Sequence, residues 1–166
     1  MLVRDITEED CEGLLMLNQQ IDQETRYMMY EPGERKTTAV QQLEMIRSFM
    51  NMNNSNIFVA EEEGILRGHL TVIGGNPRRI QHRAHLVIGI LDGFTGKGIG
   101  RLLFEKMEAW RMNTPLTRLE LTVMAHNERA ISLYTKLGFQ MEGTKKQSIF
   151  VDNAYVDEYS MAKILE

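Results

Sequence analysis

Two hydrophobic periods alternate along the chain. Apolar residues recur every three to four positions between 11 and 17 and again between 40 and 50, which predicts two amphipathic helices. Residues 2–6 (LVRDI) precede them and are predicted to form a short first strand. From residue 57 the period shortens, and runs at 57–60, 65–73 and 84–91 predict three further strands, the first two joined by a turn at Glu63-Gly64.

The second half of the chain repeats this alternation. An apolar helical stripe is predicted at 99–110, a strand at 119–123, and a helix that begins at Asn127 and ends before Gly138. Two last strands, 147–151 and 155–161, flank a predicted hairpin turn at Asp152-Asn153. The order β-α-α-β-β-β-α-β-α-β-β predicts a single α/β domain over 1–166, with a mixed central sheet flanked by helices.

Composition narrows the class of protein. The 166 residues are 43% hydrophobic and 25% charged, as in ordinary globular domains. The net charge of −4 argues against nucleic acid or a membrane surface as a partner, and no stretch approaches the ~20 apolar residues of a membrane span. Cys11 is the single cysteine, so we expect a reducing, cytoplasmic setting. The four histidines show no metal-ligand spacing, and we expect no metal.

The stretch TGKGIGRLLF, residues 95–104, places glycines at 96, 98 and 100 directly before an apolar helix. A glycine loop before a helix start exposes several free N–H groups and forms a ready anion site. The stretch is not a Walker A loop, because no Gly-Lys-Ser/Thr follows, and it does not match the dinucleotide fingerprint. On these residues alone, a plain tight turn into the helix remains an equal alternative.

A second motif follows about thirty residues later. Residues 127–139 read NERAISLYTKLGF, and the two motifs with the strand between them resemble the GCN5-related N-acetyltransferase family. In that family the loop reads Gln/Arg-x-x-Gly-x-Gly/Ala, and the later helix reads Asn-x-x-Ala-Ile-x-Leu-Tyr-x-Lys-x-Gly-Phe. This chain departs from the loop pattern at its first position, which is Thr95.

The resemblance implies acetyl-CoA as the acetyl donor and gives backbone roles to two segments. The pantetheine arm would pair with one strand, and the pyrophosphate would bind the loop amides. The implied cofactor-binding residues are Ile88, Gly89, Ile90, Gly96, Lys97, Gly98, Ile99, Gly100, Arg101 and Asn127. Two have competing structural explanations, because Gly89 can mark a bulge and Asn127 can serve only as a helix N-cap.

Tyr134 is the predicted general acid. Attack of an amine on a thioester expels a thiolate, and a phenol can protonate it. The alternative is a core aromatic, since Tyr134 lies at helical spacing from Leu137. His85 is a possible general base, because imidazole titrates near neutrality and the strand around it lacks a carboxylate; a histidine bonded to a neighbour or to solvent explains it equally well.

The acceptor is predicted to be a primary amine on an amino acid, a small amine or a protein N-terminus. Glu24, Tyr27 and Tyr155 are candidates for the acceptor wall, although each also fits an ordinary loop or hairpin residue. The basic loop at 78–83 is another candidate, for an acceptor carboxylate or the cofactor's 3′-phosphate, against a simple solvated face. A homodimer is possible.

Two functions from different classes therefore compete. The first is an enzyme that transfers acetyl groups by direct attack in a ternary complex. The second is a non-catalytic acyl-CoA sensor, which Thr95 and the absent strand carboxylate favour and Tyr134 disfavours. A P-loop nucleotide-binding protein is a weaker third interpretation.

Overall fold

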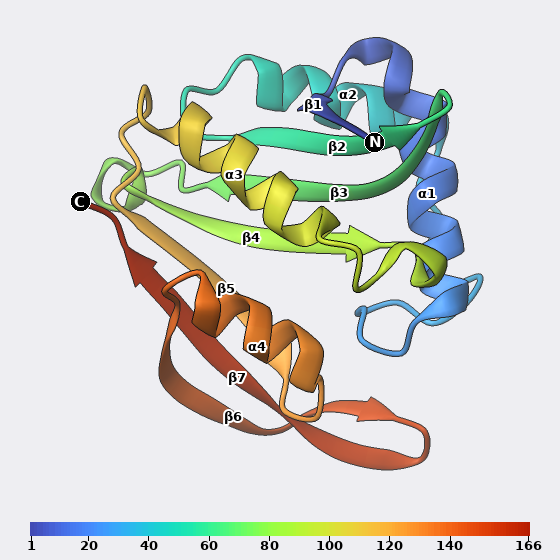
Figure 1. Cartoon of the computed structure of the whole chain (residues 1–166), viewed down its shortest axis with the longest axis vertical. Helices are drawn as coiled ribbons and strands as arrows, with labels where there is room; N and C mark the ends of the chain where they lie inside the picture. The colour runs from blue at the N-terminus through green and yellow to red at the C-terminus, as the bar shows by residue number, and fades with distance from the viewer.

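The computed structural model describes residues 1–166 and contains a seven-stranded mixed sheet in the order β1-β2-β3-β4-β5-β7-β6. Only the β4–β5 pair is parallel (Figure 1). The strands are β1 (Leu2–Asp5), β2 (Asn56–Glu62), β3 (Ile65–Gly74), β4 (Arg83–Ile90), β5 (Arg118–Met124), β6 (Gln140–Val151) and β7 (Ala154–Ile164); the helices are α1 (Cys11–Glu24), α2 (Ala39–Met50), α3 (Ile99–Arg111) and α4 (Glu128–Lys136). The predicted α/β class and element order are confirmed.

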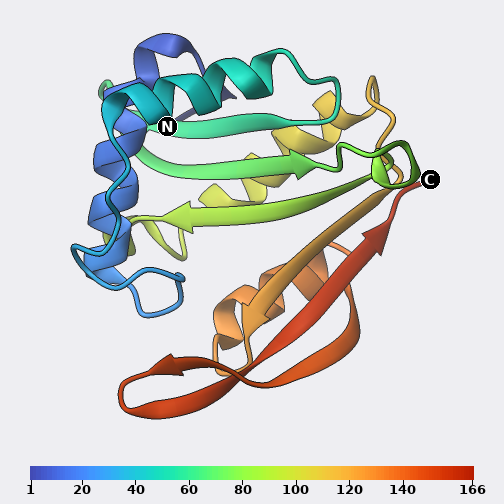
Figure 2. The same cartoon turned by 180° about the vertical axis from the view of Figure 1, so that it is seen from behind.

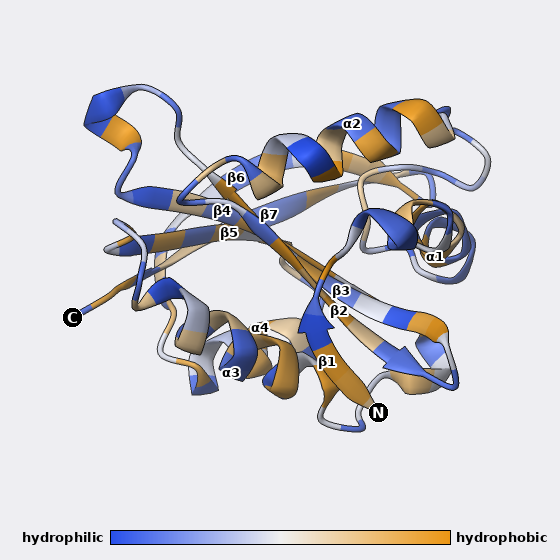
Figure 3. Ribbon diagram, turned by 90° about the horizontal axis from the view of Figure 1, so that it is seen from above, coloured by the Kyte–Doolittle hydropathy of each residue, from blue (hydrophilic) through white to orange (hydrophobic).

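The helices form two layers, with α1 and α2 on one face of the sheet and α3 and α4 on the other (Figure 3). Side chains alternate between these layers along each strand. In β2, Ile57 and Val59 join a buried cluster with α1 and α2, whereas Phe58 and Ala60 join a larger cluster with α3. Burial of both faces explains the near-continuous apolar sequence of β2.

The sheet opens between β4 and β5. These strands are in register at only three positions, the last of which is His85 opposite Glu120. Beyond that point they diverge, and the wedge between them is visible from both sides (Figures 1 and 2). By contrast, β4 pairs with β3, and β5 with β7, over seven register positions each. The opening is therefore local to one strand pair.

The start of β6 was predicted wrongly. The strand begins at Gln140 rather than at 147. Its first part was missed because residues 140–146 are exposed and mostly polar, with Met141 as their single large apolar residue and no hydrophobic alternation. This edge strand is held by its pairing with β7 alone. Gln147 adopts a positive φ of 52° at a register shift, and its amide donates to Asp157 at 2.8 Å. An irregular polar edge strand offers no hydrophobic period to detect.

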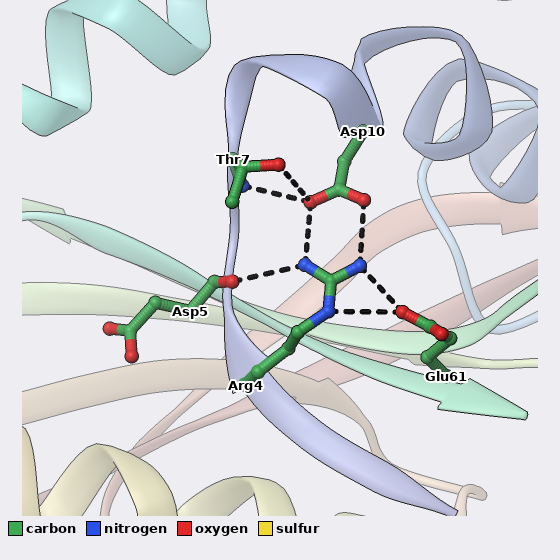
Figure 4. A network of polar contacts seen from close by, with 5 residues as sticks. All are labelled: Arg4, Asp5, Thr7, Asp10 and Glu61. Atoms are coloured by element: carbon green, nitrogen blue, oxygen red, sulfur yellow. Dashed lines mark hydrogen bonds and ion pairs between the residues drawn. The ribbon is translucent and has the colours of Figure 1, made fainter. Parts of the chain in front are cut away.

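An arginine cluster ties the N-terminal edge strand to the rest of the fold (Figure 4). The Arg4 guanidinium donates to both oxygens of Asp10, at 2.7 and 2.8 Å, and to Glu61 on β2, at 2.6 and 3.0 Å. Asp10 also accepts from the Thr7 amide at 2.8 Å. Hydrogen bonds from Arg4 hold the pKa of the Asp10 carboxyl below its usual value.

We expect Arg4→Met to lower the free energy of unfolding by about 1–2 kcal/mol, because it leaves two carboxylates without their shared cation at a partly solvated site. Arg47→Met is the control, since Arg47 forms a more exposed pair with Glu8 and should change stability little. Because the pKa of Asp10 is lowered in the fold, its contribution is present at neutral pH and is lost as the solution is acidified below about pH 4. Urea unfolding at pH 7 and pH 3 measures both effects; equal losses in the two variants at pH 7 would contradict the assignment.

Candidate active site

A cavity of about 890 Å³ lies where β4 and β5 diverge. Its walls come from both strands, from the loop before α3, from the first turns of α4 and from the segment between α1 and α2. Side chains from both faces of the sheet line it, so the cavity passes through the gap between the two strands. The predicted cofactor segments, the predicted acid and part of the predicted acceptor wall thus border one space.

The glycine loop leaves a row of backbone donors free. Gly96 and Gly98 have φ values of 72° and 82°, a conformation that residues with a side chain rarely adopt. None of the amides from residue 96 to residue 101 donates a hydrogen bond within the protein. A glycine is needed at position 100 for a different reason, because a Cβ there would lie 2.9 Å from Leu133 on α4. The loop therefore presents free amides at the start of a helix that packs closely against α4, an arrangement suited to an anion.

Arg129 supplies a cation at this loop that sequence reasoning missed. It lies in the first turn of α4, and its Nη1 donates to the Thr95 hydroxyl at 2.6 Å. Thr95 in turn donates to the Asp92 carbonyl at 2.9 Å. The departure from the family pattern at Thr95 is therefore matched by an arginine from another element. Arg129 is visible in the sequence, two residues after Asn127, but its contact with Thr95 depends on the tertiary fold.

Tyr134 combines both interpretations considered for it. Its ring packs in the core, 6.1 Å from Phe104 and 6.0 Å from Phe139 between ring centroids. The residue also lines the cavity, and its hydroxyl makes no hydrogen bond within the protein. Burial raises the pKa of the Tyr134 phenol above its usual value. The hydroxyl therefore keeps its proton at neutral pH and can donate it.

The predicted strand segment at residues 88–90 lines the cavity on the β4 side. The proposed bulge at Gly89 is absent, because the β3–β4 register runs without a shift. Gly89 instead makes room for neighbours: a Cβ would lie 2.9 Å from His69 Nε2 and 2.9 Å from Ile21. His69 is buried, its Nδ1 lies 3.0 Å from the Thr71 hydroxyl, and its Nε2 has no partner.

Desolvation, and to a lesser extent the charge of Arg35, lowers the pKa of His69 to about 4, so this imidazole is neutral at pH 7. Arg35 itself lines the cavity, held by two hydrogen bonds to the buried Asp22 at 2.7 and 3.1 Å and placed over the Tyr30 ring. Sequence reasoning did not single out Arg35, because its polar surroundings at 33–38 are typical of a solvated loop.

The acceptor candidates divide into two groups. His85 and Tyr27 line the cavity. Glu24 does not: its carboxylate accepts from the Asp92 amide and the Gln20 side chain, both at 2.8 Å. Tyr155 also lies outside, 66% exposed and packed against Phe150.

Two predicted cofactor-binding residues differ in position. Asn127 lines the cavity and caps α4 by accepting from the Ala130 amide, whereas Lys97 lies over the Phe94 ring and does not line the cavity.

The basic loop at 78–83 does not reach the cavity. It connects β3 to β4 at the end of the sheet where β4 and β5 are still paired, away from the opening (Figure 1). Arg83 faces Glu120 there at 3.9 Å. The alternative of a solvated face is therefore the one that the structure supports for this loop.

The segment between α1 and α2 reaches across to the far side of the opening. Arg26 forms an ion pair with Asp152 in the β6–β7 turn at 2.9 Å. Next to it, the Tyr27 ring lies 5.3 Å from the His126 ring, measured between centroids. These contacts connect the two diverging halves of the sheet.

The comparisons agree with this geometry. The model of the Acetyltransferase (GNAT) family matches residues 18–139. The L-amino acid N-acetyltransferase AaaT of Escherichia coli is 36% identical over 108 residues, which cover 64% of this chain and 66% of that protein, just under two thirds of its length.

Solved structures share the complete fold. A GNAT-family acetyltransferase from Streptococcus pneumoniae superposes with a TM-score of 0.95 at 25% identity and 99% coverage of both chains. The acetyltransferase yncA of Salmonella typhimurium, solved with acetyl-CoA, has a TM-score of 0.87 at 16% identity, with 99% of this chain and 94% of that chain covered.

The chain belongs to the acetyltransferase (GNAT) family. This confirms the predicted family and the class of enzyme that its description names, acetyltransferase. No helix has the length and apolar composition that crossing a bilayer requires.

Arg129 should strengthen binding of the cofactor's phosphates at the loop. We expect Arg129→Gln to raise the Kd for CoA about three- to tenfold, because it removes one solvated cation beside the free amides. The difference should shrink at high salt. Calorimetric titration with CoA measures it, with Lys136→Gln, at the other end of α4, as the control. Equal affinities for the two variants would exclude this role.

His69 should make stability depend on pH between about 6.5 and 4. Its pKa is lower in the fold than in the unfolded chain, so acidification through this window protonates the unfolded state first and costs up to about 3 kcal/mol. Urea unfolding of the wild type and of His69→Gln at several pH values tests this, since the other three histidines are common to both. The variant should lose most of the slope; an unchanged slope would show that His69 is not its source.

Proposed function

We propose that this protein transfers the acetyl group of acetyl-CoA to the α-amino group of a small amino acid by direct attack in a ternary complex. The observation that carries the proposal is the cavity in the β4–β5 opening, because it joins free loop amides, an unpaired β4 edge and the Tyr134 hydroxyl. The thioester arm enters between the strands, with its pyrophosphate on the amides of Gly96–Arg101 and its amides on the backbone of residues 88–90.

In this proposal Tyr134 donates its proton to the departing sulfur. The neutral amine attacks the carbonyl carbon of the thioester, the C–S bond breaks, and the thiolate takes the phenolic proton. Because burial keeps that phenol protonated, the acid is in its active form throughout the neutral range. The amine's surplus proton leaves to a base on the cavity wall, for which His85 is the candidate that sequence reasoning named.

Three features favour a free amino acid over a protein N-terminus. The Arg26–Asp152 and Tyr27–His126 contacts span the opening on the proposed acceptor side. Arg35, half-buried in the lining, offers guanidinium donors to a carboxylate. Similarity to a relative that acts on L-amino acids points the same way. Methionines in the lining, at 28, 29 and 124, would suit an apolar side chain on the acceptor. A reducing cytoplasmic location fits the single cysteine.

We expect Tyr134→Phe to lower kcat about 10²- to 10³-fold with little change in acetyl-CoA affinity, because only the proton donor is lost. Release of free thiol from acetyl-CoA, assayed with amino acids, polyamines, aminoglycosides and N-terminal peptides, measures it. Tyr159→Phe is the control, since Tyr159 lies on β7 outside the cavity lining. Acetyl-CoA binding without thiol release from any acceptor would refute the proposal in favour of the acyl-CoA sensor.

A further inference from the structure

The cavity contains a carboxylate that the strand sequence around His85 lacks. Three carboxylate residues line it: Asp92, Glu128 and Glu158. Asp92 and Glu128 are exposed, whereas Glu158 is half-buried. Its neighbour Asp157 is engaged with Gln147 and Lys146, but the Glu158 carboxylate has no hydrogen bond or ion pair within the protein. A half-buried carboxylate without a partner in the protein, at a cavity wall, is available to bind a cation that enters the cavity.

The register of the sheet fixes the side from which Glu158 acts. Tyr159 is opposite Val123, and both pack toward α3 and α4. Glu158, opposite Met124, therefore lies on the other face, toward α1. His85 lies on that same α1 face, because its neighbours Ala84 and Leu86 pack with α3 and α4. Tyr134 belongs to the α3–α4 side, so Glu158 and the proposed acid stand on opposite sides of the gap.

The geometry points to Glu158 as the group that binds the acceptor's ammonium and removes its proton, an inference that rests on the proposed function. The acceptor enters on the α1 face as an ammonium ion and pairs with the Glu158 carboxylate. One N–H proton passes to a carboxylate oxygen, and the freed lone pair attacks the thioester carbonyl across the gap. The carbonyl carbon gains the N–C bond and loses the C–S bond, and the sulfur takes the proton of Tyr134. The second amine proton restores the phenol, and Glu158 releases its proton to water.

The charged groups around Glu158 are compatible with this role. Lys145 is directly opposite it on β6 without forming an ion pair, and His126 lies at the turn after β5. His85 on β4 and Arg35 in the segment between α1 and α2 also line the cavity. By the register, His85 is opposite Glu120, four residues along β5 from Met124, the partner of Glu158. Arg35 is already neutralised by Asp22. The carboxylate of an acceptor can therefore bind the remaining donors of Arg35, while the ammonium group of the same acceptor binds Glu158. Together these two contacts favour zwitterionic α-amino acids over polycations.

The pH dependence of kcat/KM for an L-amino acid acceptor tests the assignment. In the wild type a carboxylate accepts the proton, so we expect kcat/KM to stay level from pH 8 to pH 6. In Glu158→Gln no carboxylate removes the proton, so only acceptor molecules that are already neutral can react. The kcat/KM of this variant should therefore fall about tenfold for each pH unit below the pKa of the amine. At pH 7 the loss should be about 10²-fold or more, while the KM for acetyl-CoA stays within about twofold.

Two further variants keep the test decisive. Glu158→Asp retains a carboxylate and should restore the level profile at a reduced rate. Glu44→Gln makes the same charge change on an exposed position of α2 and should behave as wild type. The assignment is overturned if Glu158→Gln keeps the wild-type profile, if it loses activity equally at every pH, or if His85→Gln shows the sloped profile instead. Absence of thiol release from the wild type would instead defeat the proposed function, and the role of Glu158 with it.

Discussion

The early end of the β4–β5 pairing is the constraint on which the rest of this structure depends. Two strands that are each fully paired on their outer sides share only three register positions with one another. The backbone groups beyond His85 and Glu120 are left for another partner, at a cost in free energy that water or a ligand must offset. The fold therefore contains an extended row of donors and acceptors, shaped for one more strand-like chain.

Most of the strands and helices, and the glycine loop of the candidate site, could be predicted from the sequence, because the residues that form them act locally. Period-2 and period-3.6 patterns give the core strands and helices, and the loop glycines and the Asn127 cap report local backbone geometry. Residues that act through tertiary contacts could not be placed in the same way. Arg129 reaches Thr95 over thirty-four positions, and Glu24 is turned from the cavity by the Asp92 amide sixty-eight positions away. The first part of the edge strand β6, residues 140–146, carried no periodic signal, and only its end at 147–151 was predicted.

Gly89 shows how a correct residue can have an incorrect explanation. A strand glycine in a predicted cofactor segment suggests a bulge, yet the register is regular there. The missing side chain instead admits His69, which becomes fully desolvated and neutral against the β4 backbone. A larger residue at position 89 would push the imidazole and Ile21 away from the strand whose edge faces the opening. The glycine therefore preserves the shape of that strand from behind, on the face opposite α3.

In the mechanism that we propose, the opening also separates two proton transfers that would interfere in a single pocket. A base must hold a negative charge to attract an ammonium ion, whereas an acid that donates to sulfur must stay neutral. Burial among Phe104 and Phe139 keeps the Tyr134 phenol protonated on the α4 side. On the α1 side, Glu158 and Arg35 line a more open wall that solvent reaches. Because the sheet itself lies between these environments, a thioester held in the gap is the one group that both side chains would reach in the mechanism that we propose.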